Sequence, residues 1–379
     1  MRLIHTSDWQ IGKAYGFVDD ATREILRNER LEAIVRLGQL AQQHGAGTIL
    51  VAGDIYDVAA PADRTLRQPV ERMRQFPSVA WHLIPGNHDP HTSSGPWERL
   101  TRMGLPDNVH LHLAPEPAAL DGSIAYALPA VLTRRHAAGD PTEAMDRAVT
   151  PEGAIRIGLA HGSLTNFGSD PGATHNLIAF DRPERAGLAY LALGDWHGAQ
   201  VMGQRAAYSG TPQPDGFDIG GRGGGEALLV QIDGPRALPS ISFLPTGRYA
   251  WRRESATVAD DADVAVLEAR LRGLHPDLGH LLIQLKVAGT LSVEDREAFE
   301  RQIRGAVGSA VCALRIDEAD LHLQPSAADL AALSRVGAVG VAAGRLASRA
   351  ADPADPQRDV AQAALRRLYI LHAHQERSA

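Results

Sequence analysis

Residues with metal-binding side chains recur at five points of this 379-residue chain, each time directly after a short apolar run. The five segments are SDWQ (7–10), GDIYD (53–57), GNHD (86–89), AHG (160–162) and GDWH (194–197). Each segment alone is weak evidence, because an aspartate or histidine at a strand end is more often a capping or loop residue than a ligand. Five such segments in succession indicate a shared site.

The residue types in these segments suit two divalent cations. Carboxylates supply charged oxygen ligands, imidazoles supply nitrogen, and the asparagine amide supplies a neutral oxygen. Two cations about 3.5–4 Å apart can activate a water and hold both the attacking and the leaving oxygen of a phosphoester. The segments therefore predict metal-assisted hydrolysis of a phosphoester.

The elements that must position these residues form a layered α/β pattern. Apolar runs predict a strand before each segment, and amphipathic runs predict helices at 21–45 and 62–76, the second despite Pro69. In an open α/β sheet, sites form where the carboxyl ends of strands meet. We therefore expect the five segments to converge.

The overall composition limits the class of protein. A net charge of -7 excludes a protein that coats nucleic acid by charge alone, but not a nuclease, because a carboxylate-lined metal site is itself acidic. The single cysteine, Cys312, excludes an internal disulfide framework and indicates a reducing compartment. No run approaches the about 20 apolar residues of a membrane helix, and the N-terminus has no signal-peptide pattern. We predict a cytoplasmic protein without a membrane segment.

The chain changes character after residue 246. Residues 1–246 hold all five segments, and residues 247–325 follow a β-α-β-α-β pattern without a polar cluster of catalytic type. Residues 326–379 are Ala-rich, with expected helices near 327–350 and from 358 onward. These helices are expected either to dock on their own domain or to bind a partner.

On these motifs the chain resembles the calcineurin-like metallophosphoesterases, and among them the SbcD-type nuclease subunits of the SbcCD DNA repair exonucleases. The resemblance is carried by HTSDW, AGDIYD, IPGNHD, the AHG step and YSGTPQP (208–214), and it covers residues 1–245. It implies a four-layer α/β/β/α sandwich with a small α+β capping domain that binds DNA. It also implies C-terminal helices that bind an SMC-like coiled-coil ATPase of the SbcC type, and a homodimer.

The resemblance also implies a role for each polar residue. The first metal would be bound by Asp8, Gln10, Asp54 and His197, and the second by Asp54, Asn87, His161 and Asp195. His88 and Asp89 are the predicted catalytic residues. His88 would stabilise charge or protonate the leaving oxygen beside the phosphate, and Asp89 would orient the GNHD turn.

Two positions depart from the family pattern. The family usually has D-x-H in the first motif and G-H-x-H in the last, whereas this chain has Gln10 and Asp195 at the positions of one histidine each. Both replacements exchange a nitrogen donor for an oxygen donor. Oxygen-rich sites favour harder cations, so we predict two divalent cations, with Mn²⁺ preferred, Mg²⁺ accepted and Zn²⁺ disfavoured. The neutral amide of Gln10 is the weakest ligand of the set.

Tryptophans stand beside ligands in both altered motifs. Trp9 and Trp196 could stack on bases or pack against the sheet, and packing is the prediction for each.

The leading functional hypothesis is a metal-dependent DNA nuclease that acts in DNA repair with an SMC-like ATPase partner. One alternative is another metallophosphoesterase, namely a nucleotide or cyclic-nucleotide phosphodiesterase or a phosphatase. A second alternative is a non-catalytic scaffold with an altered metal site. The sequence leaves open whether a nuclease would act as an exonuclease or an endonuclease.

Overall fold

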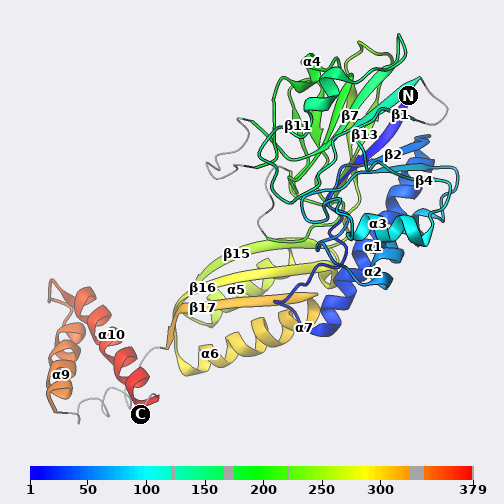
Figure 1. Cartoon of the computed structure of the whole chain (residues 1–379). Coiled ribbons are helices and arrows are strands. Elements are labelled where there is room, and N and C mark those ends of the chain that lie inside the picture. The colour runs from blue at the N-terminus through cyan, green and yellow to red at the C-terminus, as the bar shows by residue number, and fades with distance from the viewer. Residues whose placement is uncertain (121–123, 166–174, 218, 220–221, 324–336, 378–379) are drawn as a thin grey trace. The chain divides into compact units, whose positions relative to one another are not determined.

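The computed structural model describes residues 1–377 apart from 121–123, 166–174, 218, 220–221 and 324–336 (Figure 1). The chain divides into two compact units, Met1–Ala250 and Trp251–Ala379. No helix in the described ranges is long and apolar enough to span a bilayer.

The first unit contains a six-stranded mixed sheet in the order β14-β13-β1-β2-β3-β4. Its strands are β1 (Arg2–Thr6), β2 (Thr48–Val51), β3 (Ala80–Leu83), β4 (Val109–Leu111), β13 (Glu226–Gln231) and β14 (Ser240–Pro245). Strands β1 to β4 run parallel, and β13 and β14 are added antiparallel. The carboxyl ends of β1, β2 and β3 therefore lie at one edge of this sheet.

A second six-stranded sheet of the same unit has the order β11-β12-β10-β7-β6-β5. Its strands are β5 (Ala118–Ala119), β6 (Ala125–Pro129), β7 (Ile155–His161), β10 (Tyr190–Gly194), β11 (Gln200–Met202) and β12 (Ala206–Tyr208). The four central strands are parallel, and β5 and β11 pair antiparallel at the edges. Two short strands, β8 (Ser163–Leu164) and β9 (Leu177–Ile178), pair separately.

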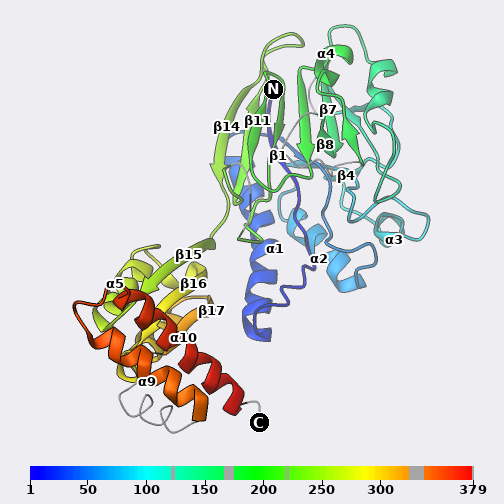
Figure 2. The same cartoon turned by 90° about the vertical axis from the view of Figure 1, so that its left-hand side faces the viewer.

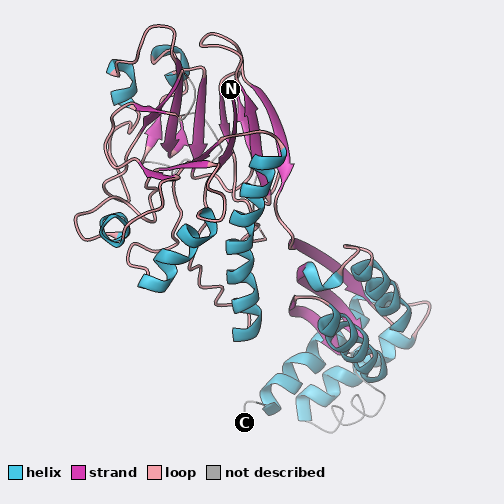
Figure 3. Cartoon of the chain, turned by 90° about the vertical axis from the view of Figure 1, so that its right-hand side faces the viewer, coloured by secondary structure: helices cyan, strands magenta, loops and turns pink. Residues whose placement is uncertain are grey.

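The helices and strands of the first unit are arranged in layers (Figure 3), and three hydrophobic cores hold the layers together. Helices α1 (Asp20–Gln43), α2 (Asp63–Met73) and α3 (Pro96–Met103) cover the first sheet through residues such as Leu37 and Trp81. The two sheets pack face to face through residues such as Leu50 and Ile157. The short helices α4 (Arg182–Arg185) and η1 (Glu143–Arg147) border the third core, on the other face of the second sheet. The prediction of a mixed α/β fold is confirmed, with two mixed sheets.

Local sequence explains where the two main helices form. The side chain of Asp19 caps α1 by accepting a hydrogen bond from the Thr22 backbone N–H at 2.8 Å. Pro69 lies inside α2 as predicted, and it is buried together with Leu66 and Val70 on the core side of the helix. Burying an apolar side chain of this size contributes about 1.5–3 kcal/mol, which offsets the hydrogen bond that proline removes.

The second unit contains a three-stranded sheet in the order β15-β16-β17. Its strands are β15 (Ala250–Val258), β16 (Leu281–Leu291) and β17 (Ala313–Leu323), and its helices are α5 (Asp261–Arg272), η2 (Leu278–His280), α6 (Val293–Phe299), η3 (Glu300–Val307) and α7 (Gly308–Ala310). Buried apolar side chains join the helices to the sheet, among them Leu267, Leu285 and Phe299. The β-α-β-α-β order is the one that the sequence predicts.

Two further helices, α9 (Gly337–Ala351) and α10 (Arg358–Arg377), lie side by side as a hairpin (Figure 2). Ala343 and Leu365 form the centre of their contact, flanked by Leu346 and Leu368. The helix predicted near 327–350 is present from Gly337, and its earlier residues lie outside the described part of the chain.

Candidate metal centre

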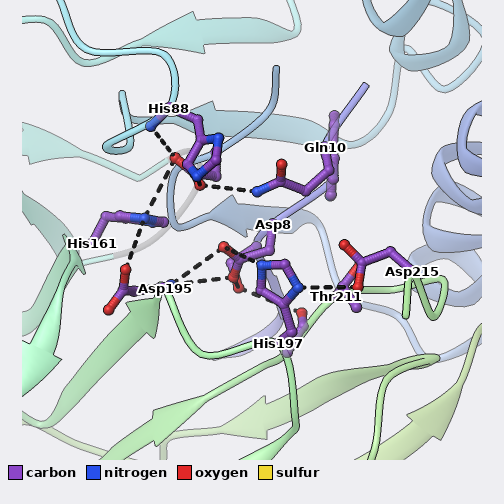
Figure 4. Close-up of polar contacts among 12 residues, drawn as sticks. Asp8, Gln10, His88, His161, Asp195, His197, Thr211 and Asp215 are labelled. Carbon is purple, nitrogen blue, oxygen red and sulfur yellow. Dashed lines mark hydrogen bonds and ion pairs between the residues drawn. The ribbon is translucent and has the colours of Figure 1, made fainter. Parts of the chain in front are cut away.

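The five polar segments converge in the first unit, as the strand-end argument predicts (Figure 4). Each contributes side chains just after, or at the end of, a parallel strand. The segments follow β1, β2, β3, β7 and β10, of which the first three belong to one sheet and the last two to the other. Both sheets therefore build the site.

The backbone at four predicted ligands is strained. Positive φ angles occur at Asp8 (53°), Gln10 (50°), Asp54 (53°) and Asp195 (105°), and only two other non-glycine residues of the described chain share this feature. Such conformations cost about 1–3 kcal/mol each and cluster at functional sites. Hydrogen bonds between the two loops hold them, from Asp8 N–H to the Gly53 carbonyl and from Gln10 N–H to the Asp54 carbonyl, both at 3.0 Å.

Asp8, Asp54 and His161 form the centre of the site. Each can direct a ligand atom so that all three atoms lie within 4.8 Å of one another, and all three residues are buried. His161 Nδ1 donates to the Ala52 carbonyl at 2.8 Å, so Nε2 faces the carboxylates, 3.4 Å from Asp54 Oδ1. A backbone partner of this kind fixes the tautomer of a metal-binding histidine.

The electrostatics of the centre favour a cation. Burial alone would lower the pKa of His161, but the carboxylates of Asp54, Asp8 and Asp195 raise it to about 9. Burial raises the pKa of Asp8, because a charged carboxylate is poorly solvated there. The negative potential at this point is therefore strong, and a divalent ion would relieve it.

Three buried polar atoms at the centre have no hydrogen-bond partner among the described residues. They are Gln10 Oε1, Asn87 Oδ1 and His161 Nε2. A buried polar atom left unsatisfied costs about 1–3 kcal/mol. Each of these atoms is a good ligand for a hard or borderline cation. The residues present therefore fit a metal centre.

Gln10 and Asn87 also make contacts to the carboxylates through their amide nitrogens. Gln10 Nε2 donates to Asp54 Oδ2 at 2.9 Å, and Asn87 Nδ2 donates to Asp195 Oδ1 at 3.0 Å. The structure thus brings Gln10 to the carboxylate of Asp54, with its amide nitrogen toward that carboxylate. Metal binding by Gln10 stays a prediction.

Asp195 connects the two sheets. Its carboxylate accepts hydrogen bonds from Asn87 Nδ2 and from Ser163 Oγ, the latter at 2.6 Å, and its backbone N–H lies 3.2 Å from Asp8 Oδ2. Ser163 directly follows the AHG segment and was not among the predicted residues. The position where the family has a histidine thus holds a carboxylate that is fixed on both sides.

His197 is held by a buried carboxylate that the motif analysis missed. His197 Nδ1 lies 3.1 Å from Asp215 Oδ1, and His197 Nε2 lies 3.9 Å from Asp8 Oδ1. Asp215 Oδ2 accepts a second hydrogen bond from Lys13 Nζ at 2.6 Å. Although burial opposes it, contact with His197, Arg30 and Lys13 keeps the pKa of Asp215 below its usual range. The position of Asp215 directly after YSGTPQP was the available signal.

Arg30 on α1 is the second residue that sequence reasoning missed. Its guanidinium is buried and donates to the backbone carbonyls of Asp8 (3.1 Å), Trp9 (2.5 Å) and Gln213 (3.1 Å), and to Thr211 Oγ1 (3.1 Å). These contacts fasten the loop of the first motif to the loop after β12. Arg30 lies within a helix, so a search for polar residues at strand ends does not find it.

The GNHD turn places His88 and Asp89 differently. His88 Nδ1 lies 3.1 Å from the Asp57 carbonyl, and its Nε2 lies 4.0 Å from Asp54 Oδ2, with a third of the side chain exposed. The Asp89 carboxylate is buried and accepts from the backbone N–H groups of Gly86 (2.6 Å) and Tyr56 (3.0 Å). His88 is therefore open to a substrate, whereas Asp89 holds the turn.

The two tryptophans of the altered motifs differ. Trp9 is buried and meets Trp81 edge to face at a ring distance of 6.0 Å, so the packing prediction is confirmed for Trp9. Trp196 is 36% exposed and lines a cavity, so the same prediction is wrong for Trp196. Trp196 follows the strand end, where the chain has already left the core of the sheet.

Comparison with known proteins agrees with the geometry. Residues 1–179 match the family model described as calcineurin-like phosphoesterase. The SbcD subunit of nuclease SbcCD from Bacillus subtilis (strain 168) is 24% identical over 381 residues, which cover 81% of this chain and 94% of that protein. The corresponding subunits from Rhodobacter capsulatus and Escherichia coli (strain K12) are 28% and 25% identical, covering 63% and 59% of this chain and 69% and 63% of their own.

Among solved structures, the crystal structure of TT1561 of Thermus thermophilus aligns with a TM-score of 0.41 at 12% identity, covering 65% of this chain and 98% of that one. That likeness is too weak to support an argument. The family match includes Asp8, Asp54 and His161, the three residues at the centre of the site. Residues 1–179 therefore match the calcineurin-like phosphoesterases, a family of generally metal-dependent hydrolases, and the chain is a distant homologue of the SbcD subunits of SbcCD nucleases.

Proposed function

We propose that this protein is a metal-dependent DNA nuclease that hydrolyses phosphodiesters with two divalent cations. The observation that carries the proposal is the buried group of Asp8, Asp54 and His161, surrounded by polar atoms without partners. The distant relatives named as nuclease subunits favour a phosphodiester of DNA over other phosphoesters.

The residues assigned to the cations form two overlapping sets. Asp8, Gln10, Asp54 and His197 would hold the first, and Asp54, Asn87, His161 and Asp195 the second. When bound, two such cations activate a water and neutralise charge on the phosphoester. Each set offers three oxygens and one nitrogen, which favours Mn²⁺ first and Mg²⁺ second over Zn²⁺.

His88 is the residue of this chain proposed to move a proton. Its Nδ1 contact with the Asp57 carbonyl orients the ring, so that Nε2 faces the side of Asp54 where a phosphate would lie. As water attacks phosphorus and the bond to the leaving oxygen breaks, Nε2 would donate a proton to that oxygen. Asp89 supports this step indirectly, because it holds the turn that carries His88.

The remaining parts of the chain are proposed to serve the same activity. The relatives are named as subunits of a two-part nuclease, so we assign an SMC-like coiled-coil ATPase of the SbcC type as the partner, bound by residues 326–379. Residues 247–325 would cap and contact the DNA, and the protein would act as a homodimer in DNA repair.

Labelled duplex and single-stranded DNA, incubated with the purified protein and Mn²⁺, test the proposal. We expect cleavage that EDTA abolishes and that His88→Ala slows about 10²–10⁴-fold, the usual contribution of a general acid. His44→Ala is the matched control. His44 follows α1, and its carbonyl lies near Arg2 at the amino end of β1, whereas the metal centre lies at the carboxyl ends of the strands.

The alternatives give different results in the same assay. Hydrolysis of nucleotide monoesters or small diesters without cleavage of DNA would replace the nuclease proposal with that of a small-molecule phosphoesterase. Full Mn²⁺ binding without hydrolysis of any phosphoester would indicate a scaffold.

A further inference from the structure

A cavity opens beside the candidate metal centre within the first unit. Its volume is about 420 Å³, within the range of about 300–1,000 Å³ that is typical of ligand pockets. Predicted ligands Asp195 and His197 form part of its wall. Whatever fills this cavity therefore lies next to the group bound at the metal centre.

The rest of the wall combines two charged side chains, Lys13 and Asp215, with aromatic and apolar ones. Trp196, Phe217 and Ile219 line the cavity, and Trp196 is 36% exposed although its two neighbours in the chain are predicted ligands. Phe217 lies in a tilted contact with Phe17, at a ring distance of 6.3 Å. Large aromatic surfaces at such a position are suited to stacking on a flat ligand.

This aromatic wall is anchored to the core of the unit. Phe17 meets Tyr15 edge to face at a ring distance of 6.4 Å, and the Tyr15 hydroxyl accepts a hydrogen bond from Arg30 Nη1 at 3.1 Å. Tyr15 is buried and has a φ of 44°, so its backbone is strained as at the predicted ligands. Strain of this kind clusters at functional sites, and Tyr15, which is not a predicted ligand, supports the wall from the core through Phe17.

The two charged lining groups outside the predicted ligand set, Lys13 and Asp215, are paired with each other. Lys13 Nζ and Asp215 Oδ2 lie 2.6 Å apart, and Asp215 Oδ1 contacts His197 Nδ1. The cavity therefore favours an uncharged, flat group, in contrast to the anion-binding chemistry of the metal centre beside it. A nucleotide combines both properties, because a flat base is attached to a phosphate.

We propose that the cavity lined by Trp196 and Phe217 binds one nucleobase of the substrate by stacking, next to the phosphodiester held at the metal centre. Single-stranded nucleic acids are commonly bound by aromatic side chains on which successive bases stack, with little regard to sequence. A base in a duplex is already stacked, so the preferred substrate is an unpaired or frayed nucleotide. This inference rests on the proposed nuclease function and specifies its substrate class.

The first test measures binding without metal. Single-stranded oligonucleotides carrying 2-aminopurine at the 5′ end, the middle or the 3′ end are titrated with protein in EDTA, because stacking quenches 2-aminopurine fluorescence. We expect quenching by the wild type and by Trp196→Phe, and its loss in Trp196→Ala and Phe217→Ala. Phe180→Ala is the matched control, since Phe180 is 51% exposed but does not line this cavity.

The second test compares cleavage of intact strands with cleavage of strands that carry an abasic tetrahydrofuran residue at the scissile position. Alanine at a base-stacking aromatic weakens binding about five- to a hundredfold. Trp196→Ala and Phe217→Ala should therefore raise KM for the intact strand by this factor and leave the abasic strand unchanged. Trp196→Phe should restore the wild-type KM for the intact strand. A variant that merely disturbed the structure would not show this recovery.

The two proposals fail in different ways. Quenching and KM values that are the same in wild type, Trp196→Ala and Phe217→Ala would overturn the nucleobase site while leaving the nuclease in place. An equal rise in KM for intact and abasic strands would also overturn the nucleobase site, because the variants would then act through the metal centre. Absence of DNA cleavage by the wild type overturns the nuclease, and the quenching measurement still decides whether a base binds. Faster hydrolysis of phenolic phosphates than of DNA, sensitive to Trp196→Ala, would replace the nucleobase with a phenolic ring.

Discussion

The two units bury very different side chains. Every polar or charged side chain that is buried in the described part of the chain lies between His5 and Thr246, in the first unit. The second unit buries apolar side chains such as Leu285 and Phe299 and keeps its charges outside, as in the pair of Lys286 and Asp320 at 2.9 Å. Both are α/β structures, so the difference lies in what each interior is used for.

Burying charge is unfavourable unless partners or a cation compensate. The first unit places Asp8, Asp54 and His161 together in its interior and adds strained backbone at two of them. The second unit has an interior that hydrophobic burial alone can stabilise. The first unit therefore loses stability to form a polar site, whereas the second unit is suited to a supporting or surface-contact role. Four measurements test this difference between the two units.

The largest effect is expected from Asp54→Asn. Asp54 accepts hydrogen bonds from His88 N–H and Gln10 Nε2 and is the ligand shared by both predicted sets. Loss of its charge should weaken Mn²⁺ binding and reduce phosphodiester hydrolysis by about 10²–10³-fold, as expected when electrostatic stabilisation at a reacting centre is lost. Titration of Mn²⁺ by EPR measures the first effect. Asp63→Asn, in an exposed pair with Arg99, should behave as wild type, and an Mn²⁺ affinity that Asp54→Asn leaves intact would contradict the assignment.

Phe299→Ala tests the purely apolar interior of the second unit. Phe299 is fully buried there, and removing a buried phenyl ring costs about 3–5 kcal/mol in free energy of unfolding. Urea unfolding should show a transition at lower denaturant for the second unit, with Mn²⁺ affinity unchanged. If Mn²⁺ affinity falls in parallel, the two interiors are not independent and the comparison fails.

Asp215→Asn separates a positioning carboxylate from a ligand. The variant keeps the size of Asp215 but weakens its contacts to His197 and Lys13. Removal of a partner of a metal-binding histidine typically lowers metal affinity about 10–100-fold, so Mn²⁺ affinity should fall by this factor. The His197 ¹⁵N chemical shifts should show a change of tautomer, and Asp215→Glu should restore part of the affinity. Unchanged His197 shifts in Asp215→Asn would show that Asp215 does not orient the ring.

The smallest expected effect concerns pH. Burial, together with the nearby His112 and His110, lowers the pKa of His82 in β3 to about 3. His82 therefore stays neutral in the folded state while the unfolded chain, with a histidine pKa near 6.5, takes up a proton as pH falls below that value. His82 therefore leaves the free energy of unfolding unchanged above about pH 6.5 and lowers it by up to about 1.4 kcal/mol per pH unit as pH falls from about 6.5 to about 3.

The free energy of unfolding, measured against pH, checks this. His82→Leu should flatten the slope between about pH 6.5 and 4 by about 1.4 kcal/mol per pH unit. His275→Gln, at a histidine that is only partly buried, is the control variant. Equal slopes in wild type and His82→Leu would mean that His82 becomes protonated inside the folded protein.

Much of the site could be predicted because it follows strand ends. Apolar runs located β1, β2, β3, β7 and β10, and parallel strands that end together bring Asp8, Asp54 and His161 to one place. Residues that reach the site from elsewhere were missed. Asp215 and Lys13 come from loops and Arg30 from a helix. Asp215 directly follows YSGTPQP, but no local period or motif connects Lys13 or Arg30 to the ligands. Trp196 was wrongly assigned to packing. The exposure of a residue after a strand end depends on the loops that surround it, and the sequence pattern does not show their positions.

The sequence by itself determined the alternation of strands and helices, the acidic and imidazole side chains at five strand ends, and the exchange of nitrogen for oxygen at Gln10 and Asp195. These features depend on residue type and on spacing along the chain. Only the tertiary structure decided that Gln10 turns its amide nitrogen to Asp54, that Asp215 holds His197, and that Trp196 opens onto a cavity. Side-chain orientation and exposure depend on contacts between residues far apart in the chain, and spacing along the sequence carries no record of them.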